Sequence, residues 1–148
     1  MNFLKRGNKK AQLDISFGML FSIILIIIFI AFGFYAIKSF MNTQNSLQIK
    51  QFTEELQTNI DKIWREVQGR QTVSYSLPKQ ITFVCFQDDE FENLKFISEN
   101  VIRGKIIQNI DIQTTLSGEE ELCIQNIKGK VSFKIAKDYG ETLVKIEK

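Results

Sequence analysis

The chain has 148 residues, of which 44% are hydrophobic and one is proline. This composition is typical of a folded chain and leaves room for one modest domain beside an N-terminal segment. The formal net charge is +2, but residues 41–148 hold 14 basic against 16 acidic side chains, a net charge of 14 − 16 = −2. The positive charge therefore lies at the N-terminus. We expect no nucleic-acid partner, because such a partner needs basic residues clustered on the folded part.

Two residue types that often carry chemistry are scarce. The sequence contains no histidine and only two cysteines, Cys85 and Cys123. Zinc sites built from four cysteines, or from two cysteines and two histidines, are therefore excluded, as is a cysteine–histidine nucleophile. The spacing of Asp, Glu, Ser and Lys residues in the sequence does not indicate a catalytic site. We expect neither an enzyme nor a bound metal or other cofactor.

The first predicted element is a membrane-spanning helix. Residues 15–37, ISFGMLFSIILIIIFIAFGFYAI, form an uncharged run of 37 − 15 + 1 = 23 residues. A helix of that length rises about 34 Å, enough to cross a hydrocarbon core of about 30 Å. Only two basic residues, Lys38 and Lys50, follow the run closely. Four precede it closely: Lys5, Arg6, Lys9 and Lys10. This asymmetry predicts a cytoplasmic N-terminus, with residues 38–148 outside.

Two other interpretations of the apolar run are weaker. A helix buried in a protein core is the first, but such apolar runs are usually shorter. A cleaved secretory signal is the second. It would need an apolar region of about 7–15 residues followed by a small-residue cleavage site. The sequence after Ile37, KSFMNTQN, offers no such site.

The helix is expected to continue beyond the membrane. Neither Pro nor Gly occurs between Lys38 and Gln68, and a stripe with helical spacing runs through Phe52, Leu56, Ile60, Ile63 and Val67, widened by Trp64. This stripe predicts an amphipathic helix that packs on a sheet. We expect one helix from about residue 15 to 68, capped by Gly69. A break at residues 41–46, MNTQNS, is the alternative, since their side chains compete for backbone hydrogen bonds.

From Thr72 the apolar spacing changes to two, which is typical of strands. Val73, Tyr75 and Leu77 alternate with polar residues, and Ile81, Phe83 and Cys85 do so after Pro78. Further strands are predicted at 106–112, at 122–127, and in a hairpin of 131–135 and 142–146 around the turn KDYGE. Residues 96–105 fit either a short helix or a strand. The predicted fold class is α+β: a long N-terminal helix followed by a small antiparallel β-sheet domain.

Two features of this β domain bear on its stability and ligands. Both cysteines fall in predicted strands of an extracytoplasmic region, so we expect a Cys85–Cys123 disulfide, with two buried free thiols as the alternative. The 77 residues from 72 to 148 (148 − 72 + 1) make a small core that such a bond would support. The acidic stretch QDDEFENL, residues 87–94, lacks the spacing of a calcium-binding loop and is interpreted as a solvated loop.

The order of these elements resembles the type IV pilins, in detail the archaeal class. Their class III signal sequences are cut by a prepilin peptidase on the cytoplasmic side, before the apolar segment. Lys9, Lys10 and Ala11 match the basic, basic, small pattern, and Gln12 matches the residue that often starts the mature chain. The resemblance implies cleavage after Ala11, which leaves 148 − 11 = 137 residues. The chain then divides into a leader (1–11), a membrane or filament-core helix (12–37), its amphipathic extension (38–70) and the β domain (71–148).

The resemblance also implies partners. Many pilins carry Glu at the fifth mature position, where this chain has Ser16, a departure that fits a minor subunit or a protein that stays in the membrane. Small residues at which helices could approach closely are Ser16, Gly18, Ser22, Ala31 and Gly33; the alternative is that they sit among lipid tails. The resemblance predicts a filament subunit that meets membrane lipid, a prepilin peptidase and like subunits. The alternative is an uncleaved, single-pass anchored module whose β domain binds an envelope partner or mediates adhesion to another cell.

Overall fold

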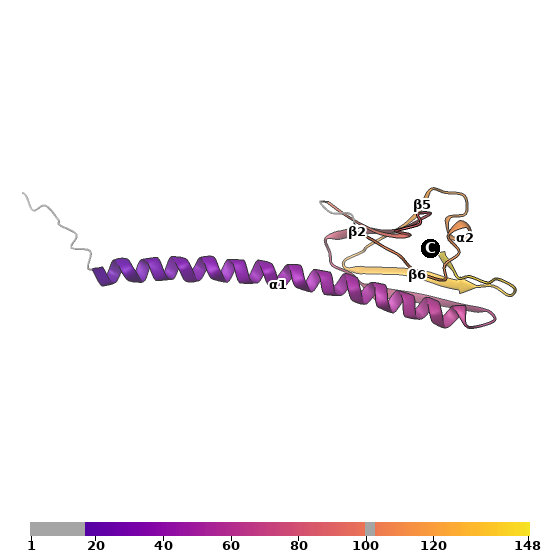
Figure 1. Ribbon diagram of the computed structural model, residues 1–148, viewed down its shortest axis with the longest axis horizontal. Coiled ribbons are helices and arrows are strands. Elements are labelled where there is room, and N and C mark those ends of the chain that lie inside the picture. The colour runs from indigo at the N-terminus through magenta and orange to yellow at the C-terminus, as the bar shows by residue number, and fades with distance from the viewer. Residues whose placement is uncertain (1–16, 100–102) are drawn as a thin grey trace, which may run out of the picture. The chain divides into compact units, whose positions relative to one another are not determined.

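The computed structural model describes residues 17–99 and 103–148. The chain forms two compact units, the first ending at Met41 and the second covering Asn42–Lys148. Its elements in chain order (Figure 1) are α1 (Phe17–Trp64), β1 (Gly69–Ser76), β2 (Ile81–Gln87), β3 (Leu94–Ser98), β4 (Arg103–Lys105), α2 (Ile112–Leu116), β5 (Glu121–Gln125), β6 (Lys130–Lys137) and β7 (Lys145–Glu147). The predicted α+β class, a long apolar N-terminal helix followed by antiparallel sheet, is confirmed.

Helix α1 is unbroken through residues 41–46, where a break was the alternative. At least one polar side chain there bonds to the helix's own backbone. The Ser46 hydroxyl donates to the carbonyl of Asn42, four residues earlier, at 3.1 Å. This back-bonding uses an acceptor that already belongs to the helix, so the backbone ladder stays intact.

The strands form two antiparallel sheets rather than one. β1, β6 and β7 make a three-stranded sheet in the order β1-β6-β7, and the other four strands make a sheet in the order β4-β3-β2-β5. The predicted closing hairpin is β6 and β7, which pair antiparallel. The segment that fitted either helix or strand ends in strands: β3 pairs with β4, Phe96 lying opposite Arg103.

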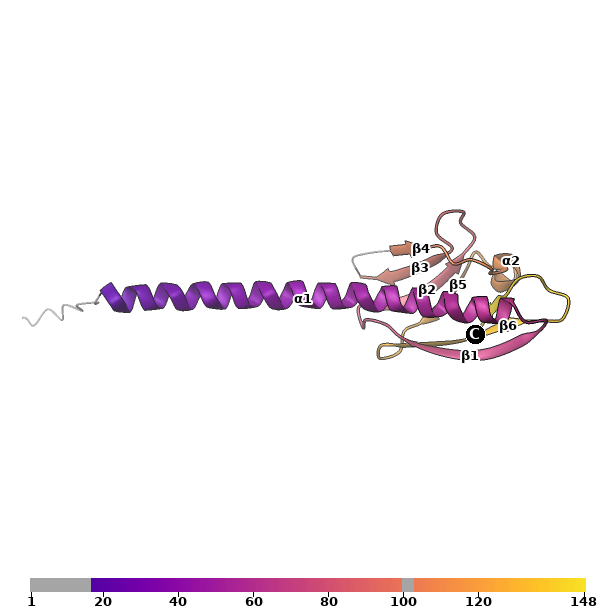
Figure 2. The same cartoon turned by 60° about the horizontal axis from the view of Figure 1, so that its bottom comes forward.

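One hydrophobic core joins the second half of α1 to both sheets. Figures 1 and 2 show that part of the helix running alongside β1 and β6. Aromatic rings connect the three layers: Phe52 of α1 contacts Tyr75 of β1 with ring centroids 5.0 Å apart and Phe96 of β3 at 5.5 Å. Phe133 of β6 contacts Phe86 of β2 at 5.8 Å. The helix therefore contributes to one core with both sheets.

The predicted helical stripe is buried along most of its length. Ile49, Phe52, Leu56, Ile60 and Ile63 are each at most 7% exposed. Their spacing of three and four residues places them on one face of α1, the face that the sheets cover. This part of the predicted helix-to-sheet packing is present.

The expected end of that stripe is wrong. Helix α1 stops at Trp64 rather than at residue 68, Trp64 is 40% exposed, and Val67 is 70% exposed. Val67 lies beyond the last helical turn, so helical spacing no longer carries it to the buried face. Trp64 directly follows Ile63 and is therefore rotated about 100° from the stripe. Neither residue packs in the core.

Gly69 does not cap the helix in a left-handed conformation but begins β1. A Cβ atom at Gly69 would lie 2.7 Å from a carboxylate oxygen of Glu66 and 3.3 Å from Ile63. A side chain at this position would have to displace the exposed Glu66 carboxylate and press on Ile63. Lys137 of β6 satisfies the helix end instead, because its Nζ donates to the carbonyls of Trp64 at 2.7 Å and Glu66 at 2.9 Å.

The strand predicted at 106–112 is also wrong. Asn109 has a φ of 63°, which turns the backbone out of any strand, and Asp111 caps helix α2. Hydrogen bonds tie this segment to α1: the N–H of Gln108 donates to the Gln57 side chain at 2.9 Å, and the Asn109 amide donates to Asp61 at 2.9 Å. Side-chain hydrogen bonds of Asn and Asp offer the backbone an alternative to a sheet ladder.

Candidate functional site

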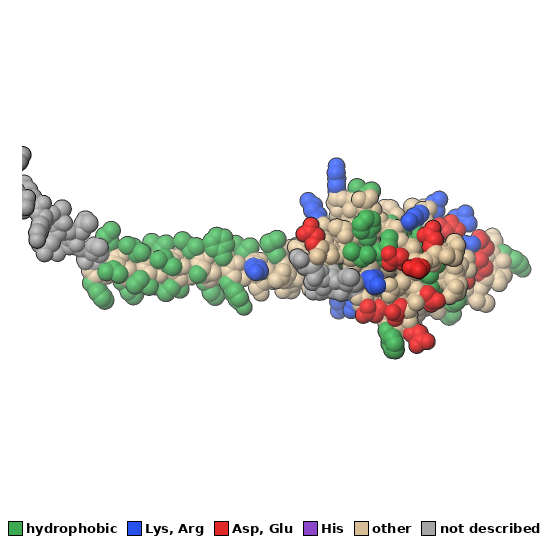
Figure 3. All heavy atoms as spheres, turned by 90° about the horizontal axis from the view of Figure 1, so that it is seen from above, with side chains coloured by type: hydrophobic (Ala, Val, Ile, Leu, Met, Phe, Trp, Pro, Cys, Tyr) green, Lys and Arg blue, Asp and Glu red, His purple; other side chains and the backbone are tan. Residues whose placement is uncertain are grey.

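The first half of α1 presents an apolar surface without a protein partner in its unit. Every large hydrophobic side chain from residue 17 to residue 41 is at least 37% exposed, and several aromatic ones exceed 70%, among them Phe17, Phe29 and Tyr35. In Figure 3 the green apolar side chains line the visible face of this segment. Soluble monomers rarely expose contiguous apolar patches beyond a few hundred Å².

By length and composition, α1 is the one helix among residues 17–99 and 103–148 that qualifies as a membrane span. None of its most apolar window is buried within the structure. A helix that packs inside a soluble protein would bury one face, as α1 does from Ile49 onward. The exposed segment therefore fits lipid or other apolar helices as its surroundings.

Three of the five predicted small positions fall on one face of this segment. At about 100° per residue, Gly18, Ser22 and Gly33 lie within about 60° of one another on the helix surface, whereas Ala31 lies on the opposite side. The Ser22 hydroxyl donates to the carbonyl of Gly18 at 2.8 Å. Because the helix itself satisfies this hydroxyl, the face offers no unpaired donor to an apolar environment.

The fold of this unit does not require the small size of Gly33, because a Cβ atom there would meet nothing within 4 Å. Ala36 lies on the same face as Gly18, Ser22 and Gly33, within the same arc. The sequence reasoning missed Ala36, which plotting the helix angle of every small residue would have found. Ser16 and the predicted processing residues Lys9, Lys10, Ala11 and Gln12 lie outside the described residues.

The expected disulfide joins Cys85 and Cys123. The two residues are direct partners in the β2–β5 register, and their sulfur atoms are 2.06 Å apart. Glu121 places a carboxylate oxygen near the sulfurs, and this is the one group of three potential metal ligands that the described residues bring together. Both sulfurs belong to the disulfide, so neither offers a thiolate to a metal.

The acidic stretch after β2 uses its carboxylates for local hydrogen bonds. Asp89 accepts from the N–H groups of Phe91 at 2.8 Å and Glu92 at 3.2 Å, and Asp88 accepts from the side-chain amide of Gln113 at 2.7 Å. These bonds shape the turn between β2 and β3 and fasten it to α2. The contacts fit the interpretation of a loop rather than an ion-binding site.

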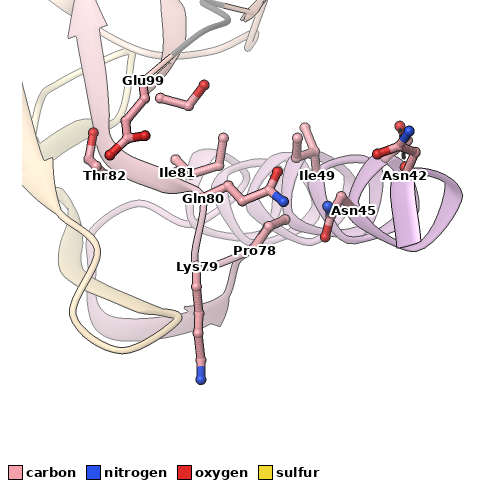
Figure 4. Close-up of a pocket in the computed structure, with 11 residues that line it drawn as sticks. Asn42, Asn45, Ile49, Pro78, Lys79, Gln80, Ile81, Thr82 and Glu99 are labelled. Carbon is pink, nitrogen blue, oxygen red and sulfur yellow. Dashed lines mark hydrogen bonds between the residues drawn. The ribbon is translucent and has the colours of Figure 1, made fainter. Parts of the chain in front are cut away.

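A groove of about 790 Å³ lies in the second unit, between the α1 residues from Asn42 to Ile49 and the loop that joins β1 to β2 (Figure 4). Six of its eleven lining residues carry amide or hydroxyl groups, and Glu99 supplies a carboxylate. The Lys79 ammonium group points away from the groove in Figure 4. The lining can donate and accept hydrogen bonds but does not pair a nucleophile with a base.

Comparison with protein-family models, with curated proteins and with solved structures returned no match.

Proposed function

We propose that this chain is a pilin-like structural subunit of a cell-surface filament. In this proposal the N-terminus inserts from the cytoplasmic side, a prepilin peptidase removes residues 1–11, and the apolar helix packs with like helices. The observation that carries it is the division of α1. Its large side chains are exposed and apolar on all sides from residue 17 to 37, and the same unbroken helix then supplies a buried stripe in the core of a folded β unit.

Such a helix has two favourable environments. In a bilayer, lipid tails cover its apolar side chains. Once it leaves the bilayer, only other apolar helices can keep those side chains from water, and the cost of exposing so much apolar surface would otherwise forbid extraction. The face formed by Gly18, Ser22, Gly33 and Ala36 supports close helix packing, because small residues let helix backbones approach.

The second unit supports the other requirement of a filament subunit, a domain that stays folded outside the cell. The Cys85–Cys123 bond links β2 to β5 and suits an oxidising compartment. Leu56 and Ile60 of α1 are 0% exposed within the core. Separating the domain from its apolar anchor would therefore expose these buried helix side chains to water.

The alternative is an uncleaved, single-pass anchored module whose β domain binds a partner. Ser16 favours it, because this position lacks the carboxylate that many pilins carry at the fifth mature residue. The two proposals differ in the N-terminal processing step, which an anchor does not need.

The variant Ala11→Phe tests the proposal. A bulky residue before the cut bond should block processing and prevent release of the chain into a shed filament fraction. Asn8→Phe is the matched control, because it adds the same side chain three residues upstream and should be processed like the parent chain. Equal N-termini and equal shed amounts for parent, control and Ala11→Phe would reject the filament proposal and favour the anchored module.

A further inference from the structure

Two neighbouring turns gather exposed lysines at one end of the second unit. We name the residues Lys79, Ile127, Lys128 and Lys130 the basic end. Lys79 lies in the loop between β1 and β2, and the others lie at the turn that joins β5 to β6; all four are exposed. The Ile127 side chain, in the same turn as the lysines, is 63% exposed.

Hydrogen bonds hold these two turns together. The N–H of Leu77 donates to the carbonyl of Gly129 at 3.0 Å, and the Asn126 amide donates to the carbonyls of Pro78 at 3.0 Å and Ile81 at 2.7 Å. A Cβ atom on Gly129 would lie 3.7 Å from the Lys79 side chain. The basic end is therefore a fixed surface, built by the fold.

Acidic residues are scarce around the basic end. Residues 67–87 and 122–137, which include both turns, contain no Asp or Glu, and neither do residues 15–53. Within the described parts of the chain, none of the three lysines forms an ion pair. The nearby acid is Glu99, which lines the groove that Lys79 also borders. Positive charge at this end is thus largely uncompensated.

The opposite end of the three-stranded sheet differs. There Lys145 pairs with Asp138 and, at 3.5 Å, with Glu141, while Arg70 lies 3.5 Å from Asp138. Basic and acidic groups therefore neutralise each other at that end. The three lysines of the basic end, in contrast, have no acidic partner among the described residues.

Chain connectivity limits how far the start of the second unit can lie from the predicted membrane surface. Asn42 lines the same groove as Lys79, and it follows Ile37, the last residue of the apolar run, by five residues. These five residues belong to helix α1, so they rise only about 8 Å along it. A lysine near this point lies within reach of a surface whose potential decays over about 10 Å at ordinary salt.

From this arrangement we infer that the basic end docks on anionic lipid headgroups of the membrane that the first half of α1 crosses. The lysines meet the negative headgroups, and Ile127 enters the headgroup layer between them. If the outer leaflet is as anionic as a cytoplasmic leaflet, each lysine near it favours the docked state roughly fivefold. The inference rests on the membrane insertion in the proposed function, but on neither cleavage nor filament assembly.

The test uses the full chain in lipid nanodiscs, with a fluorophore on Ser76→Cys and an acceptor on the lipids. Ser76 is exposed and pairs with Lys130, so it reports the distance of the basic end from the bilayer. Energy transfer should be higher in discs that contain phosphatidylglycerol than in discs of phosphatidylcholine alone. The difference should disappear as salt rises tenfold, because screening weakens exposed charges.

The triple variant Lys79→Glu/Lys128→Glu/Lys130→Glu should lose this lipid dependence. The control Lys62→Glu/Lys134→Glu/Lys148→Glu makes the same change in net charge at exposed lysines outside the basic end and should keep it. Equal energy transfer for the parent chain in both lipids would overturn the inference. So would equal loss in both triple variants.

A second copy of the chain is the competing occupant. If the lysines bind another subunit, their reversal should weaken concentration-dependent association in uncharged detergent, and that result would also overturn lipid docking. Resistance of the membrane-bound chain to alkaline extraction reports insertion separately. An inserted chain without lipid-dependent transfer refutes the docking alone, whereas a chain that does not insert refutes the proposed function as well.

Discussion

Replacing Leu56 by alanine tests whether α1 is an integral part of the β unit's core. Leu56 is 0% exposed and lies in the buried stripe between Phe52 and Ile60. Removing its buried methyl and methylene groups costs their transfer free energy and leaves a cavity, and such changes cost about 2–5 kcal/mol. Because Leu56 is fully buried in the core, we predict a loss of about 3 kcal/mol in the free energy of unfolding.

Leu47→Ala is the matched control. Leu47 belongs to the same helix but is 55% exposed, so the same truncation removes little buried surface. Alanine also has the highest helix propensity. The control should therefore change the free energy of unfolding by no more than about 0.5 kcal/mol.

Trp64 provides the assay, because it is the single tryptophan and lies where α1 meets the β unit. Its fluorescence during urea unfolding of the full chain in mild detergent reports the stability of the second unit. Equal midpoints for Leu56→Ala and the parent chain would refute the reasoning, since they would mean that the helix does not complete the core. A large loss in Leu47→Ala as well would show that the change acts through the helix alone.

Three further predictions concern contacts in the second unit. Replacing both Cys85 and Cys123 by alanine should lower the free energy of unfolding by about 4 kcal/mol, from the loop-closure entropy of a 38-residue separation, as measured by urea unfolding without reductant. Lys137→Met should cost about 2 kcal/mol, because two carbonyls at the end of α1 lose a charged donor, whereas Lys134→Met on the exposed face of the same strand should leave the unfolding midpoint unchanged. Asp111→Ala should cost about 1 kcal/mol at neutral pH through loss of the α2 cap. A hydrogen bond from a backbone N–H in the first turn of α2 lowers the pKa of Asp111 from its ordinary value of 3.8, so this difference should persist above that value and vanish as pH falls through the lowered pKa; a difference that grows in acid would contradict the assignment.

The helix and the β region could be predicted from sequence because apolar residues recur with a different period in each. Residues 15–37 are recognisable as a spanning helix by the length of their uncharged run. The stripe from Phe52 to Ile63 is recognisable by apolar residues three or four positions apart. Alternation marked β1, β2 and β6. These signals are local, and the fold satisfies them without contradiction.

The end of α1 depends on a contact that the sequence does not display. Lys137 lies 73 residues after Trp64, and its ammonium group bonds to the carbonyl of Trp64 at 2.7 Å. A glycine at position 69 fits a helix cap equally well by sequence. The structure instead places Gly69 at the start of β1, close to Glu66 and Ile63. Only the packed structure defines that contact.

The missed turn at residues 106–111 has a similar cause. Its alternation of isoleucine with polar residues fits a strand, but Asn109 and Asp111 form side-chain hydrogen bonds with α1 and α2. The partition into two sheets could not be predicted either, because strand order depends on pairings between residues distant in sequence. The exposed face with Gly18, Ser22, Gly33 and Ala36 could be found from helix angle alone.

The most direct test of the proposed filament subunit is the N-terminus of the protein in its native membrane and shed-surface fractions, determined by mass spectrometry. The account predicts a chain of 137 residues that begins at Gln12, after loss of residues 1–11 (148 − 11). A chain that retains Lys5 to Lys10 in both fractions would contradict it and leave an anchored module with an extracytoplasmic β domain.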